Sequence, residues 1–343
     1  MPRFIATLGA LALIGSAAVA DTPPNGLGAL SVSPDGTTIL TAGDSRVLFT
    51  IDAASLEVTQ RYWLGTTPVW LGHTKDGLVL MRDTSGDVSA HDPDSFAEVW
   101  RVRNTMDSAL AAQANWVVYT LRRGRSAFLE VADASTGEVK ASYELGDMRS
   151  EAIGVRPDGM RIAILGAGEK RPSEERQRPS SDLKGIEREL FRQQHDQRGA
   201  RIVLIDVQAG SVVDTDSWYS AGGVRELAVR GDDSFVLTIG LGSARIGPDG
   251  EPELIDTGAR SHYGAMLSSD GTTIVSGSLA EITAKGLEVA TARKVKLDRL
   301  PGWPEYVVGF AEAPDGGIIA TTSGFRVLKL PADLSSVEAR PVY

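Results

Sequence analysis

Histidines are the residues most often used for acid–base chemistry near neutral pH, and this chain of 343 residues has four of them. They are His73, His91, His195 and His262. None belongs to a His-Glu-x-x-His motif or another paired spacing, so the sequence predicts no zinc site. The absence of cysteine excludes disulfides, thiolate catalysis and thioether-attached haem. We therefore expect neither a metal nor a cofactor.

His262 is the histidine whose neighbours suggest chemistry, because Arg260 and Tyr263 lie beside it in the sequence. It could act there as an acid or a base, or it could be a structural histidine. The chain has no Gly-x-Ser-x-Gly nucleophile elbow, no complete calcium loop and no dinucleotide-binding motif in a strand–helix context. Whether the protein is an enzyme is thus left open, and the motifs favour a non-catalytic role.

An Asp-Gly pair recurs along the chain at intervals of about forty residues, a period typical of propeller repeats. Such a pair supplies the positive φ that a tight hairpin needs. The pairs are Asp35-Gly36, Asp76-Gly77, Asp158-Gly159, Asp270-Gly271 and Asp315-Gly316, with Asp232-Asp233 standing in once. The spacing predicts that one structural unit is repeated along the chain.

Residues 27–64 form the plainest unit, with four short apolar runs separated by three turns. Such a meander cannot bury both faces alone, so neighbouring copies must stack on it. Applied to the whole chain, the spacing predicts seven units, at 27–64, 65–103, 104–145, 146–219, 220–257, 258–298 and 299–343.

A second recurring turn has the pattern Asp-x-x-Thr-Gly-x-Val, seen most fully from Asp133 to Val139. With the Gly-Thr-Thr-Pro at 65–68 and the Ser-Pro-Asp-Gly at 33–36, this pattern resembles the YVTN-type and WD40-like repeats of exported bacterial proteins. The resemblance covers nearly the whole chain. It implies an all-β fold, a seven-bladed β-propeller of four-stranded antiparallel blades.

The resemblance implies two kinds of function, because related seven-bladed propellers include sugar lactonases and the heavy subunits of periplasmic amine dehydrogenases. Lactonases imply a His, a Glu and an Arg at the channel mouth, for which this chain offers His262, Glu226 or Glu151, and Arg225. The heavy subunits imply a scaffold without a cofactor of its own. A non-catalytic scaffold is our leading expectation, and a lactonase-like hydrolase is the alternative.

Residues 1–20 have the three parts of a secretory signal: Arg3, an apolar run and a small-residue end at Ala17-Ala18-Val19-Ala20. We expect cleavage after Ala20, a periplasmic location and one propeller domain at 21–343 without a membrane span. The net charge of −10 makes nucleic acid a poor partner for the surface as a whole. The sequence predicts no particular oligomeric state.

The fourth unit contains an insertion at 166–200, expected between the second and third strands of its blade. Its first half is charged and contains two prolines, which predicts an irregular arm. Its second half, 181–198, has helical composition, and Leu183, Ile186, Leu190 and Phe191 form one apolar stripe. This predicted helix either packs on its own disc or presents the stripe to another protein.

In a four-stranded meander, successive turns lie on alternate edges of the blade. The Asp-Gly turns should therefore share one face of the disc, and the insertion should lie on the opposite face with the connections between blades. We expect a protein partner from the cell envelope to bind this second face, because arginines and aromatic residues concentrate there. Besides the stripe, the candidate binding residues are Arg123, Arg125, Tyr219, Tyr263, Trp303 and Tyr306.

Overall fold

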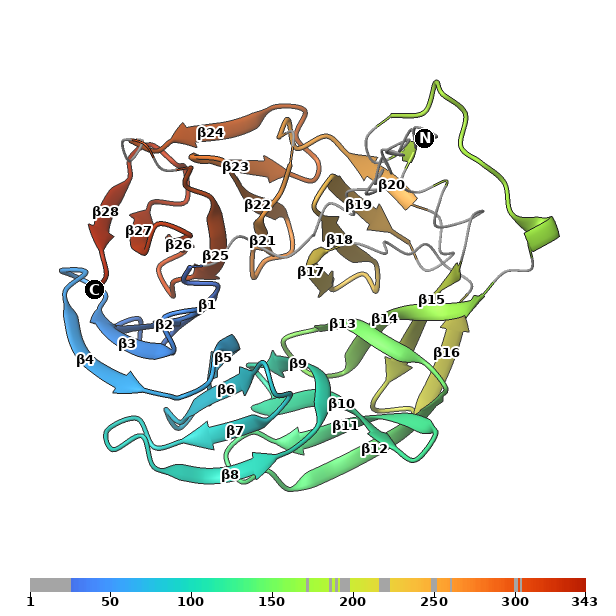
Figure 1. Ribbon diagram of the computed structural model, residues 1–343, viewed down its shortest axis with the longest axis horizontal. Helices are drawn as coiled ribbons and strands as arrows, with labels where there is room; N and C mark the ends of the chain where they lie inside the picture. Colours follow the sequence, from blue (N-terminus) through green and yellow to red (C-terminus); the bar gives the residue numbers. More distant parts are fainter. Residues whose placement is uncertain are drawn as a thin grey trace, which may run out of the picture.

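The computed structural model describes residues 26–170, 173–184, 187–188, 191, 198–215, 223–247, 252–259, 261–298, 302 and 304–343. Its strands form seven four-stranded antiparallel sheets, each built from four consecutive strands and arranged as the blades of a ring (Figure 1). The predicted seven-bladed propeller is confirmed. The predicted signal at 1–20 lies outside the described residues. Within them, no helix is long and apolar enough to cross a membrane.

The strands of the first three blades follow the predicted units closely. They are β1 (Ala29–Val32), β2 (Thr38–Ala42), β3 (Val47–Asp52), β4 (Val58–Trp63), β5 (Pro68–His73), β6 (Val79–Asp83), β7 (Val88–His91), β8 (Glu98–Val102), β9 (Thr105–Ala111), β10 (Trp116–Arg123), β11 (Ser126–Asp133) and β12 (Val139–Gly146).

The remaining four blades continue in the same order. They are built from β13 (Arg149–Val155), β14 (Arg161–Lys170), β15 (Arg198–Asp206), β16 (Ser211–Thr215), β17 (Val224–Val229), β18 (Phe235–Ile239), β19 (Gly242–Ile246), β20 (Pro252–Ile255), β21 (Gly264–Leu267), β22 (Thr273–Ser278), β23 (Glu281–Gly286), β24 (Ala292–Lys296), β25 (Val307–Glu312), β26 (Ile318–Thr322), β27 (Arg326–Leu330) and β28 (Glu338–Pro341).

The recurring Asp-Gly pairs are structural, as the turn chemistry predicts. Asp35 accepts hydrogen bonds from the Ser33 hydroxyl at 2.6 Å and from the Thr37 amide at 3.1 Å, while Gly36 has a φ of 73°. These hydrogen bonds lower the pKa of Asp35 to about 2. The carboxylate therefore caps its own turn, which explains why the pattern returns in blade after blade.

Apolar side chains from adjacent blades interlock to form the core, and the inner strands approach each other very closely. A Cβ on Gly154 would lie 2.5 Å from the carbonyl oxygen of Leu227, and one on Gly264 would lie 2.3 Å from that of Val308. Both contacts are with backbone of the next blade, which cannot yield easily. Small residues at these positions are thus required by the crowding around the axis.

The ring closes by packing between the last and first blades, without exchange of a strand. Leu27, Ile39 and Phe49 of the first blade share a buried cluster with Ile319 and Val327 of the last. The Leu27 amide also donates to the Thr322 carbonyl at 3.3 Å. Closure therefore depends mainly on apolar burial.

The fourth blade differs from the prediction in two ways. Because β14 and β15 are longer than expected, the connection between them spans 171–197 instead of the predicted 166–200. The helix does not begin at Ser181, since residues 181–184 are a turn and irregular chain, and only 187, 188 and 191 have helical conformation among those described. Ile186 and Leu190 of the stripe lie outside the described residues. A short 3₁₀ helix, Ser173–Glu175, was not predicted.

Candidate functional site

The two faces of the disc carry different sets of connections between the strands. We call the face with the turns between first and second, and third and fourth, strands the Asp-Gly face. The opposite face, which we call the connection face, holds the turns between second and third strands and the links between blades, as the antiparallel strand order dictates. The connection at 171–197 belongs to this face, and Figure 1 shows its described part extending away from the ring. We call this connection the arm.

In five blades, the innermost strand contains a bulge near its first residues, at the connection face. The register shift falls at the same place each time, and the bulged residues are Val69, Met106, Glu151, Arg225 and Val308. A bulge re-aims the side chains around it and is common next to functional sites. Two of the predicted site residues, Glu151 and Arg225, are therefore bulge residues. The sequence contains no signal for this feature.

His262 is buried, with an exposure of 1%, and does not face the channel mouth as a free base. Its Nε2 lies 3.2 Å from the Thr257 hydroxyl, and Arg225 Nε donates to its carbonyl oxygen at 3.0 Å. Burial, together with the positive charge of Arg225, lowers the pKa of His262 to about 4. The imidazole is thus neutral at physiological pH and holds the start of blade six against blade five.

Glu226 is the residue that follows the bulge of β17, and it is half-buried. Among the described residues, its carboxylate has no ion pair and no hydrogen-bond partner. Burial raises the pKa of Glu226 to about 7, far above the ordinary value of 4.5. Raised carboxylate pKa values of this kind occur at functional sites and at structural ones. Glu151 is exposed on blade four, and the structure shows no hydrogen-bonded group that joins it to Glu226 and His262.

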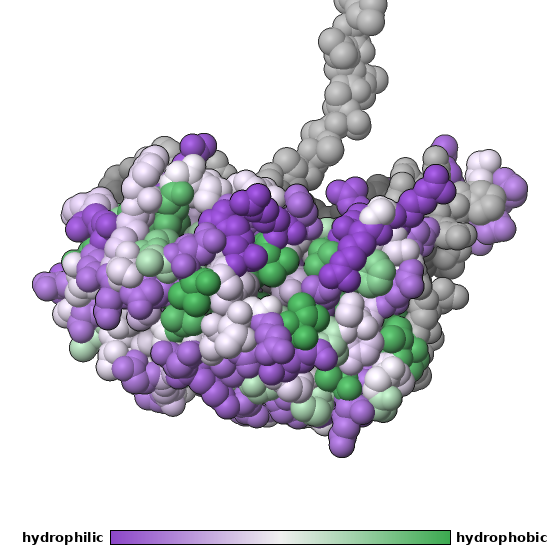
Figure 2. All heavy atoms as spheres, turned by 90° about the horizontal axis from the view of Figure 1, so that it is seen from below, coloured by the Kyte–Doolittle hydropathy of each residue, from purple (hydrophilic) through white to green (hydrophobic). Residues whose placement is uncertain are grey.

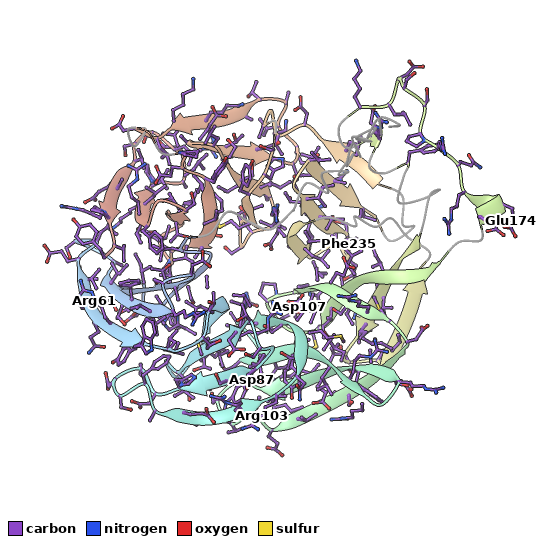
Figure 3. All side chains as sticks on the ribbon, viewed as in Figure 1. Arg61, Asp87, Arg103, Asp107, Glu174 and Phe235 are labelled. Atoms are coloured by element: carbon purple, nitrogen blue, oxygen red, sulfur yellow. The ribbon has the colours of Figure 1, made fainter. Side chains whose placement is uncertain are left out.

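The sequence analysis missed an ion pair at the equivalent position of blade three. Arg82 Nη2 lies 2.9 Å from Asp107 Oδ1, and Arg82 Nη1 donates to the Met106 carbonyl at 2.6 Å. Figure 3 shows Asp107 at the inner edge of the ring. Burial raises the pKa of Asp107, and Arg82 opposes that effect. The two residues are distant in sequence and on different blades, so no local pattern could have paired them.

Two predicted binding residues come together on the connection face. The rings of Tyr263 and Tyr306 have centroids 4.3 Å apart, and Tyr306 forms an isolated bridge with Leu279. Leu279 is 46% exposed and Leu241 is 49% exposed. Leu241 directly follows Gly240, whose carbonyl accepts a hydrogen bond from the His262 amide. We call Leu241, Tyr263, Leu279 and Tyr306 the aromatic ledge. Tyr219 and Trp303 lie outside the described residues.

Arg123 and Arg125 lie at the tip of the long β10–β11 hairpin, also on the connection face. Arg123 is held by an ion pair with the buried Glu130 and lies over the Phe128 ring, 5.3 Å from its centroid. This residue therefore has a structural role that the prediction did not include. Arg125 is exposed, and we find no ion pair for it in the described part of the chain.

The outer rim offers less continuous apolar surface than the ledge. In the view of Figure 2, small apolar patches are separated by hydrophilic residues. Val99 on β8 and Val139 on β12 are exposed, but each lies on a strand that also carries charged side chains. Scattered apolar residues of this kind are normal on a protein surface, whereas contiguous ones suggest a binding surface.

Other parts of the chain that could hold a ligand have simpler explanations. A groove of about 540 Å³ lies on the Asp-Gly face between the first two blades, next to Asp35, His73 and Asp76. Both carboxylates already serve turns or neighbouring hydroxyls, and Asp76 accepts from Ser135 at 2.7 Å. His73 is bound to the Ser31 hydroxyl at 2.8 Å. The described residues contain no group of acidic or histidine side chains arranged to hold a metal ion.

Comparison with known proteins adds no family and no relative to this description. No protein-family model matches the chain, and neither does any curated protein sequence.

Proposed function

We propose that this protein is an exported, non-catalytic β-propeller scaffold that binds a protein partner in the cell envelope through its connection face. The observation that carries the proposal is the aromatic ledge, which lies on the face that also bears the arm. The tilted rings of Tyr263 and Tyr306 are in contact, Leu279 bridges to Tyr306, and Leu279 and Leu241 are both about half-exposed. Exposed aromatic and aliphatic groups on loops above a rigid scaffold are typical of interaction surfaces.

The arm supports the same interpretation. Residues 173–184 are mostly exposed, and the Leu183 amide donates within the arm to the Ser180 carbonyl. Leu183 and Phe191, the two described residues of the predicted stripe, are only half-buried. This exposure favours presentation of the arm to a partner over packing on its own disc.

Export and family membership are part of this proposal. Export rests on the signal pattern of residues 1–20, and membership of the YVTN-type or WD40-like repeat family rests on the recurring turn motifs. The recurring turn motifs predict a seven-bladed ring, and many unrelated functions use that fold. The fold by itself therefore does not choose between a scaffold and an enzyme.

The hydrolase alternative gains no support from the geometry. His262 is buried and neutral, and the Arg225 side chain binds its carbonyl oxygen. A general base must lie within hydrogen-bond reach of the substrate proton that it removes. Of the predicted His, Glu and Arg set, Glu226 alone combines partial exposure with a strongly raised pKa.

Site-specific photo-cross-linking in the producing cell tests the scaffold proposal. A cross-linker at Leu279, on the connection face, should give a discrete adduct with one protein. The matched control is Val289, which is 56% exposed on the Asp-Gly face of the same blade and should give none. Replacing 171–197 by a short turn should weaken the Leu279 adduct. Equal adducts from both positions, or none from Leu279, would contradict the proposal.

A further inference from the structure

Glu226 and Asp107 occupy the same position in two different blades. Each is the first residue after the inner-strand bulge, and each pairs across the sheet with a buried threonine, Thr238 and Thr120 respectively. Leu227, the next residue after Glu226, packs into the apolar cluster shared with blade four. Because side chains alternate along a strand, Glu226 points to the opposite side, toward the channel and blade six.

Asp107 shows what satisfies a carboxylate at this position. It pairs with the Arg82 guanidinium at 2.9 Å and accepts the Ser108 amide at 2.9 Å. It also accepts a hydrogen bond from the amide of Ile153 on the next blade. A guanidinium and backbone amides together thus balance the charge of a carboxylate that is largely withdrawn from water.

Among the described residues, Glu226 has no such cation, and the repeat shows why. Arg82 lies on the second strand of the preceding blade, opposite Trp70, the first residue after that blade's bulge. The equivalent residue of blade four is opposite Ala152, and it is Leu165. Leu165 is fully buried in an apolar cluster. Beside Asp107, the preceding blade supplies a guanidinium. At the equivalent place beside Glu226, the preceding blade supplies no cationic side chain.

The seam between blades five and six holds a buried hydroxyl without a hydrogen-bond partner. In the described chain, six apolar clusters join the other neighbouring blades, and none joins these two. Ser276 lies on β22, on the side opposite Val275, which packs toward blade seven. Ser276 is 2% exposed, and its hydroxyl has no hydrogen-bond partner. Buried polar groups are normally satisfied, so this hydroxyl is free to form one more hydrogen bond; the Ser108 and Thr120 hydroxyls beside Asp107 are in the same condition.

We propose that the channel mouth beside Glu226 binds the cationic group of a ligand, a guanidinium or an ammonium, in the position that Arg82 fills beside Asp107. A carboxylate that is partly open to solvent and has no partner among the described residues gains a charge-assisted hydrogen bond from such a group. A guanidinium can also bind it in a bidentate manner. This site is separate from the aromatic ledge and does not depend on binding of a partner by the arm.

Carbon-13 NMR of the glutamate carboxyl groups tests this proposal directly on the full chain. The Glu226 signal is identified by its loss in Glu226→Gln. Two probes are titrated separately: methylguanidinium, and an acetylated Gly-Arg-Gly amide peptide. We expect a saturating probe to lower the pKa of Glu226 by at least one pH unit and Glu226→Gln to weaken probe binding at least tenfold. Glu151→Gln, an exposed glutamate of the neighbouring blade, should bind the probes as the unaltered protein does.

The two probes distinguish the possible sources of the cation. Binding of the peptide at least tenfold more tightly than methylguanidinium would assign the site to an arginine of a polypeptide, and comparable binding would assign it to a small molecule. A Glu226 signal that neither probe moves would overturn the proposal, and so would equal loss of binding in Glu151→Gln. The pKa measurement uses the unaltered protein, so it stands even if Glu226→Gln folds poorly.

Discussion

Glu226 should make the protein less stable as the pH rises, which is the reverse of what an ion-paired carboxylate does. In the unfolded chain a glutamate loses its proton near 4.5, whereas in the folded protein Glu226 keeps its proton to about 7. Between these values the folded state binds more protons than the unfolded state. Linkage then requires the free energy of unfolding to fall from pH 4.5 to 7 and to change no further above that range.

The size of this effect follows from the gap between the two pKa values. At 1.36 kcal/mol per pH unit, the gap corresponds to about 3 kcal/mol. Glu226 is half-buried, so solvent screening reduces the expected cost of its charge to about 1–2 kcal/mol. Glu226→Gln keeps the shape of the side chain and removes the titration. At pH 8 the variant should therefore be more stable than the unaltered protein by about 1–2 kcal/mol, and at pH 4.5 the difference should vanish.

Urea unfolding at half-unit steps from pH 4.5 to 8 measures this difference. The three histidines whose pKa values are lowered, His73, His91 and His262, titrate in both proteins, so the difference between the two curves isolates Glu226. Glu151→Gln, which removes an exposed carboxylate from the neighbouring blade, is the control. A flat curve for Glu226→Gln, or one in which the unaltered protein gains stability with pH relative to the variant, would refute the reasoning.

Three further predictions follow from the packing and the charges. Gly264→Ala should destabilise the fold by about 2–4 kcal/mol in urea unfolding, because its Cβ would meet the Val308 backbone. Gly28→Ala, where the Cβ would meet no atom within 4 Å, should change stability by less than about 1 kcal/mol. Equal effects of the two substitutions would contradict the crowding argument. Arg82→Ala should cost about 2–3 kcal/mol, because it leaves the carboxylate of its partner Asp107 uncompensated, and Arg82→Ala combined with replacement of that aspartate by Asn should recover part of the loss. Because burial lowers the pKa of His73 to about 4, the stability of the protein should fall as the pH drops from 6.5 to 4. His73→Asn should remove part of this dependence of stability on pH in thermal unfolding. An unchanged dependence would exclude His73 as its source.

Part of the candidate site could be predicted from the sequence, because strand alternation assigns residues to faces. Tyr263 and Tyr306 were placed on the connection face in this way, and the structure shows their rings in contact. The chemistry of that face was harder to predict. His262 has the sequence neighbours of a catalytic residue, yet the fold buries it against Thr257. The burial of a side chain depends on the residues that a neighbouring blade packs against it, and the sequence of one strand does not specify those residues.

The sequence by itself determined the number of blades and their boundaries, because an Asp-Gly turn depends on φ angles and hydrogen bonds within four or five consecutive residues. It also determined which face carries the arm, because antiparallel strands alternate direction. The tertiary structure alone decided how the channel mouth is built. The bulges at Glu151 and Arg225 depend on how the first two strands of a blade pair, and the ion pair of Arg82 with Asp107 joins two blades. Among the described residues, Glu226 receives no such partner from the preceding blade. Residues far apart in sequence meet there only after the ring closes, so their electrostatics cannot be read from local spacing.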